Sequence, residues 1–129
     1  RHHQQAGLLV ARQLAEQVPE AAADALVEAG VDVIGVNCGS GPIAAIDAAQ
    51  AMGPAAAGTP LLIMPNAGLS GRVSGEFVWA AEPAYFAEQV PVFLRAGARL
   101  IGGCCGTTPE HIAAMRQSLD REVARRASA

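Results

Sequence analysis

The sequence has little charge and, in particular, few basic residues. Only 16% of its 129 residues are charged, and nine Lys and Arg residues stand against twelve Asp and Glu residues, for a formal net charge of −3. Such a chain lacks the basic face that contacts with a phosphate backbone need, so we do not expect nucleic acid as a partner. The apolar share of 51% is typical of one globular domain with a modest core, not of a disordered chain.

Long hydrophobic runs are also missing. The most apolar region, residues 51–68, is interrupted by glycines and prolines, namely Gly53, Pro54, Gly58, Pro60 and Pro65. Because a spanning helix needs about 20 consecutive apolar residues, we expect neither a membrane span nor a signal peptide here.

Cysteine is scarce, and its placement is unusual. The three cysteines are Cys38, Cys104 and Cys105, and the last two are adjacent within GGCCGTTP, residues 102–109. Three cysteines cannot all pair, so a disulfide framework is disfavoured and a reducing, cytoplasmic location is expected. A disulfide between the two neighbours would be strained, because adjacent Cα atoms are only about 3.8 Å apart.

Hydrophobic periodicity predicts strands that alternate with helices. Short apolar runs predict three strands, at residues 31–38, 61–64 and 100–103. The first of them is rich in β-branched residues and is predicted to be buried on both faces, as in a parallel sheet. Helical patterns cover residues 8–29 (divided at Pro19), 43–52 (ended by Gly53), 83–96 (bent at Pro91) and a last segment from Pro109. Residues 69–81 are predicted to form an irregular loop, and the whole order predicts an α/β fold with right-handed crossovers.

An internal repeat links the three cysteines. The segment from Ile34 to Pro42 recurs between Ile101 and Pro109, with the cysteine and the following glycine in register. Both cysteine sites then follow strands that run in the same direction, with the strand at 61–64 between them. Strands two places apart are separated by about 10 Å, and closure toward a barrel brings their end residues nearer to a common axis. We therefore expect the three sulfurs to meet.

Three converging thiolates would form a metal site with one position open. Zinc takes four ligands, and catalytic zinc sites keep one of the four free for water or substrate. No C-x-x-C pair and no His pair offers a fourth ligand, and His111, in the first turn of the last helix, is expected to be solvated. The alternatives are inert buried cysteines, which would leave the flanking glycines unexplained, and a redox-active pair of neighbouring thiols.

A zinc ion with three thiolate ligands favours thiol alkylation over hydrolysis. The site would carry net negative charge, so it would generate hydroxide poorly, but it could bind a further thiol and promote its deprotonation. An alkylated sulfur becomes a neutral thioether, which is a weak ligand and leaves readily.

Three motifs carry a family resemblance: GVNCGSGP (35–42), PNAG (65–68) and GGCCGTTPEHI (102–112). From about Ala21 to Asp120 the chain resembles the zinc-binding half of the homocysteine S-methyltransferase family, and most of all the methyltransferase domain fused to methylenetetrahydrofolate reductase in bifunctional bacterial proteins. The family fold is a (β/α)8 TIM barrel. The resemblance implies that the three strands are the sixth, seventh and eighth of that barrel, and that the reaction is methyl transfer to homocysteine, giving methionine.

The resemblance also implies roles for individual residues. Cys38, Cys104 and Cys105 would be the zinc ligands at the catalytic centre, with the open position taken by the sulfur of homocysteine. The amide oxygen of Asn66 is implied to fill that position without substrate, while the residues alone equally suggest a turn residue before Gly68. The methyl donor stays open between methyltetrahydrofolate, methylcobalamin, S-methylmethionine and betaine.

The chain departs from the family in its length and in its first residues. A full barrel needs about 250 residues, and nothing in residues 1–20 resembles its first strands. We expect residues 1–20 to form a helical extension and residues 21–129 the C-terminal half of the barrel domain, with an exposed apolar face. Such a half would be a fragment, a truncated gene product or one part of an assembly that another chain completes. A non-catalytic remnant that binds zinc or thiols is the alternative function.

Overall fold

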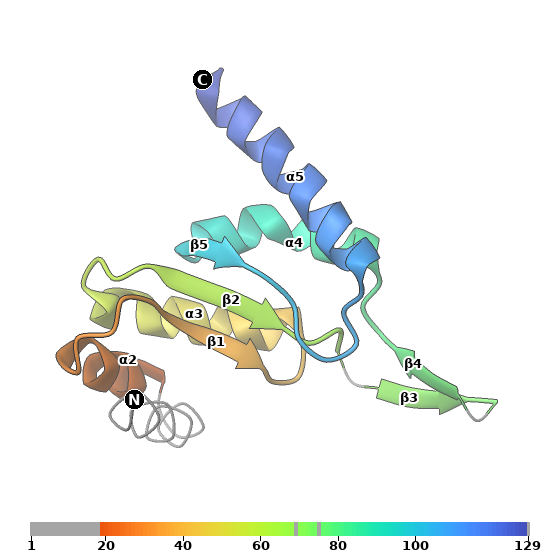
Figure 1. The fold of residues 1–129 in the computed structure, drawn as a ribbon, viewed down its shortest axis with the longest axis horizontal. Coiled ribbons are helices and arrows are strands. Elements are labelled where there is room, and N and C mark those ends of the chain that lie inside the picture. Colours follow the sequence, from red (N-terminus) through yellow and green to blue (C-terminus); the bar gives the residue numbers. More distant parts are fainter. Residues whose placement is uncertain (1–18, 69, 75, 129) are drawn as a thin grey trace.

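The computed structural model describes residues 19–68, 70–74 and 76–128, and these form an α/β fold around a parallel sheet. The sheet contains β1 (Ile34–Cys38), β2 (Leu61–Pro65) and β5 (Ala98–Ile101) in the order β1-β2-β5, all parallel (Figure 1). Helices separate these strands along the chain. The predicted alternation is confirmed, and it is consistent with part of a (β/α)8 barrel.

The described residues contain four helices, and each begins with a proline: α2 (Pro19–Glu28), α3 (Pro42–Ala56), α4 (Pro83–Arg95) and α5 (Pro109–Ala127). Proline suits this position because the first amide of a helix has no intrahelical partner. Across the described ranges, no helix is both long and apolar enough to cross a bilayer. The predicted N-terminal extension lies almost wholly outside the described residues, which begin at Pro19.

One face of the sheet is buried under helices and the other is open. Ile34 pairs with Leu61 and Leu61 with Ala98, and all three side chains are buried. On the opposite face, Leu100 is 45% exposed and the neighbouring positions of β1 are exposed. The prediction that β1 is buried on both faces is therefore wrong. Leu100 on this open face is an exposed apolar side chain, in line with the exposed apolar face expected of a half-barrel.

Helix α3 runs further than predicted, through Gly53 and Pro54 to Ala56. Proline at this position removes one helical hydrogen bond. Met52 before this proline and Ala56 after it lie on the apolar stripe of the helix, and both are buried, with 1% and 3% exposure. Burial of this stripe outweighs the lost bond, and the helix ends one residue later in the left-handed conformation of Ala57, φ 53°.

A β-hairpin replaces the irregular loop predicted for residues 69–81. Strand β3 (Ser70–Val73) pairs antiparallel with β4 (Glu76–Trp79), and the hairpin projects away from the parallel sheet (Figure 1). The prediction overlooked the Ser-Gly pair at 74–75, which is a turn signal, and the run Phe-Val-Trp at 77–79, which is rich in strand-forming residues.

Candidate metal centre

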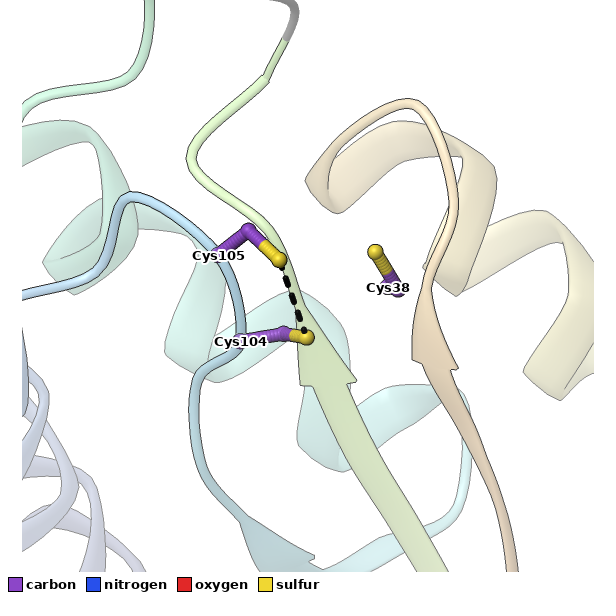
Figure 2. A group of neighbouring side chains, drawn as sticks. All are labelled: Cys38, Cys104 and Cys105. Carbon is purple, nitrogen blue, oxygen red and sulfur yellow. Dashed lines mark hydrogen bonds between the residues drawn. The ribbon is translucent and has the colours of Figure 1, made fainter.

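The three cysteines lie together at the carboxyl ends of the outer strands. Cys38 ends β1, and Cys104 and Cys105 lie in the loop after β5, on the other side of β2 (Figure 2). All three are free thiols, and their sulfur atoms lie within 4.8 Å of one another. The structure thus brings together the residues that the repeat had linked.

Main-chain hydrogen bonds hold the cysteine loop (residues 102–108) against the end of β2. The pairing of β5 with β2 continues past Ile101, since Gly102 N–H donates to Ile63 O and Cys104 N–H donates to Pro65 O, both at 2.9 Å. Ala67 N–H in turn donates to Cys105 O, also at 2.9 Å. Both cysteines are therefore positioned by backbone bonds and not only by their side chains.

Cys38 itself has an unusual backbone conformation. Its φ is 71°, in the left-handed region that non-glycine residues seldom occupy. A residue in this conformation cannot continue the alternation of a strand, so the chain turns at Cys38. Left-handed residues with a side chain cost of the order of 1–2 kcal/mol and tend to occur at functional sites.

Asn66 connects β2 to the sulfur of Cys38. Its Nδ2 donates to Gly39 O and lies 3.6 Å from Cys38 Sγ, while its Oδ1 accepts from Gly68 N–H at 2.9 Å. A carbonyl on one side and an N–H on the other fix which way the amide points. The side chain is 7% exposed. Asn66 is thus the predicted turn residue, and it also touches the cysteine cluster, with its nitrogen and not its oxygen facing the sulfur.

The surroundings shift the pKa values of the two half-buried thiols, Cys38 and Cys104, in opposite directions. The hydrogen bond from Asn66 lowers the pKa of Cys38 below the ordinary thiol value, with burial opposing this effect. Burial raises the pKa of Cys104. Of these two thiols, Cys38 therefore carries the larger thiolate fraction near neutral pH.

Removing the Asn66 amide should slow alkylation of Cys38. In Asn66→Ala the pKa of Cys38 rises toward its ordinary value, so less thiolate is present at pH 7.5. The more basic thiolate is intrinsically more reactive, which offsets part of the loss, and we expect the rate to fall about two- to fivefold. Iodoacetamide labelling with peptide mass spectrometry measures this. Well above the thiol pKa both thiols are ionised and the order should reverse, because the more basic thiolate of Asn66→Ala then reacts faster. A variant that stays slower there would assign the effect to access and not to ionisation.

The cluster fits a soft, tetrahedral metal ion. Four ligands at a Zn–S distance of about 2.3 Å occupy corners about 3.8 Å apart. Cys104 Sγ and Cys105 Sγ are separated by 3.8 Å. Cys38 and Cys104 are half-buried and Cys105 is exposed, so the sulfurs do not behave as inert core residues, and a fourth ligand could approach from solvent.

Comparison with known proteins agrees with this geometry. Residues 6–119 match the family described as homocysteine S-methyltransferase, a range that includes all three cysteines and Asn66. The chain belongs to this family. The match begins at residue 6, earlier than the resemblance over residues 21–120 that the motifs alone indicate.

Several curated relatives of the family are similar to the chain. It is 39% identical over 93 residues to methionine synthase of Mycobacterium leprae, covering 71% of the chain and 8% of the relative. It is 33% identical over 121 residues to betaine–homocysteine S-methyltransferase 1 of Danio rerio, covering 81% and 30%. It is 46% identical over 59 residues to homocysteine S-methyltransferase of Escherichia coli K12, covering 44% and 19%. The chain thus spans less than a third of the length of these relatives.

Two further residues, His111 and Trp79, have a place in the structure that the sequence did not predict. His111 is 5% exposed, so the expectation that it is solvated is wrong, and it accepts a hydrogen bond from Thr108 N–H at the start of α5. The available signal was its position three residues after Thr108, where a side chain that reaches back completes a capping box. Trp79, at the end of β4, lies over Gly106 in the cysteine loop.

Proposed function

We propose that the protein containing this chain transfers a methyl group to the thiol of homocysteine, giving methionine, at a zinc ion held by Cys38, Cys104 and Cys105. The observation that carries the proposal is the convergence of three sulfurs within 4.8 Å from two strand ends. Family membership supports the substrate class. The three free thiols also suit a reducing compartment, and we propose the cytoplasm.

Each residue of the site would have a separate role. The three thiolates would hold the ion, and a bound zinc would supply a ligand position that accepts a substrate thiol and favours its thiolate. Asn66 would keep Cys38 oriented through its amide nitrogen. The exposed side of Cys105 leaves a path for the substrate.

The balance of the reaction is that of an alkylation. The thiol proton goes to solvent, the sulfur forms a bond to the methyl carbon, and the bond between that carbon and the donor breaks. The product is a neutral thioether, which binds soft metals less well than a thiolate, so its release is favoured.

Asn66 has a second proposed role, as the ligand in the absence of substrate. In the described conformation its Oδ1 accepts from Gly68 N–H and its Nδ2 donates to Gly39 O. Coordination through oxygen would therefore require the amide to rotate and give up both bonds, together with its contact to Cys38 Sγ. With zinc bound and substrate absent, Asn66 would hold the position that homocysteine takes when it binds.

Zinc removal tests the proposed function. Chelation of the ion should abolish methionine formation from homocysteine, and added zinc should restore it, because the thiol would otherwise stay largely protonated at neutral pH. The assay follows methionine with methyltetrahydrofolate, methylcobalamin, S-methylmethionine and betaine in turn. A protein that binds zinc and homocysteine but forms no methionine with any donor would be the non-catalytic remnant instead. Turnover that survives complete zinc removal would refute the proposal.

A further inference from the structure

His111 is a buried polar residue that the proposed chemistry does not use. Its Nδ1 accepts from Thr108 N–H at 3.1 Å and faces the Thr108 hydroxyl at 2.9 Å. The proton of the neutral ring is therefore on Nε2, which donates to Ala81 O at 2.8 Å. The edge of the ring packs against Phe86, with centroids 4.9 Å apart. His111 thus has a single, fixed orientation.

From Ala81 a line of hydrogen bonds leads back to the cysteines. Ala81 N–H donates to Ala67 O at 2.7 Å, and Ala67 N–H donates to Cys105 O at 2.9 Å. Both alanines are buried, at 8% and 0% exposure. The segment from Cys105 to His111 is therefore held at its two ends. Cys105 is bonded to Ala67 in the loop after β2, His111 is bonded to Ala81 in the loop before α4, and these two loops are bonded to each other.

We infer that His111 is a positioning residue, which holds the loop of Cys104 and Cys105 in place for the metal through Ala81 and Ala67. The inference rests on the proposed function, because it concerns the same cluster. Residues that orient metal ligands without touching the metal typically change metal affinity about 10–100-fold when they are replaced. Loss of the bond from Nε2 would leave Ala81 less firmly held. Ala67, which is bonded to Ala81, would then hold the carbonyl of Cys105 less firmly as well.

The same helix offers a matched control. Ser118 is also buried, at 6% exposure, and its Oγ donates to Ala87 O at 2.7 Å. Like His111, it ties α5 to the α4 region through one side-chain bond to a carbonyl. Unlike His111, which bonds to Thr108 of the cysteine loop, Ser118 has no hydrogen bond to that loop among the described residues. Ser118→Ala therefore weakens the attachment of α5 without disturbing the line of bonds.

The experiment compares His111→Asn with Ser118→Ala in the 129-residue chain. Asparagine can still accept from Thr108 N–H but is too short to reach Ala81 O. We expect His111→Asn to weaken Zn²⁺ binding about 10–100-fold in competition with a chromophoric chelator, and Ser118→Ala to stay within about threefold of wild type. In the metal-free chain, amide exchange at Ala67 should be about tenfold faster in His111→Asn only.

Two results would overturn the inference: wild-type zinc affinity and Ala67 exchange in His111→Asn, or equal losses in Ser118→Ala, which would indicate general stability. The exchange measurement also separates this inference from the proposed function. If the wild-type chain bound no zinc, the proposed function would fail, and the exchange rate of Ala67 would still decide whether His111 holds the loop.

Discussion

Replacing Cys38 with alanine is expected to remove zinc from the protein. Structural zinc sites gain about 10–16 kcal/mol from four ligands. This is about 2.5–4 kcal/mol for each ligand, or about two to three powers of ten in affinity. Cys38 is the only described ligand candidate on β1, and the two remaining sulfurs come from one loop. The zinc content measured by atomic emission should fall from about one ion per chain to near zero, and methionine formation should fall with it.

The neighbouring residue Ser40 supplies the control for this experiment. Ser40 lies on the same loop, is exposed and is not one of the clustered metal-ligand candidates, so Ser40→Ala should retain the wild-type zinc content. Cys38→Ser tests the donor atom, because it keeps the size of the side chain with a poorer ligand, and it should lose zinc nearly as fully as alanine. Wild-type zinc affinity in Cys38→Ala would mean that the ion, if bound, is held elsewhere.

Replacing Gly106 with alanine is expected to destabilise the folded chain by about 2–5 kcal/mol. Gly106 has φ 76°, and a Cβ built there would overlap the indole of Trp79. The left-handed conformation costs an alanine about 1–2 kcal/mol, and overpacking against a half-buried ring adds about 1–3 kcal/mol. Because Gly106 follows Cys105 directly, the strain would also displace that cysteine and weaken zinc binding.

The internal repeat provides the comparison for Gly106. Gly39 follows Cys38 as Gly106 follows Cys105, and it has a similar φ of 82°, but nothing lies within 4 Å of a Cβ built there. Gly39→Ala should therefore cost only the conformational part, about 1–2 kcal/mol. Urea unfolding of both variants measures the difference in the free energy of unfolding. Equal destabilisation of the two would show that Trp79 does not restrict the cysteine loop.

The cysteine cluster was predictable because its signal is in the covalent order of the chain. A parallel sheet places the carboxyl ends of its strands at one edge, so a cysteine after β1 and two after β5 are brought together by topology alone. The repeat between residues 34–42 and 101–109 provided the register. The position of Asn66 near the cysteines followed from the same logic, since it comes directly after the strand between them.

Other features depend on contacts that no local pattern specifies. Helix α3 continues through Pro54 only because Met52 and Ala56 find a buried surface, which hydrophobic periodicity at a proline does not predict. His111 is buried because a carbonyl thirty residues earlier, that of Ala81, meets its ring. The exposure of one sheet face likewise depends on what packs against that face. The composition of β1 is typical of a strand covered on both faces, so the sequence alone does not predict that one face is open.

The ligand set of the bound ion is the most direct test of the proposed site. Zinc K-edge X-ray absorption of the loaded chain should show three sulfurs at about 2.3 Å and one lighter atom, and a fourth sulfur should replace the lighter atom when homocysteine is added. Fewer than three sulfurs, or an unchanged spectrum at saturating homocysteine, would contradict a zinc centre that Cys38, Cys104 and Cys105 hold open for a thiol.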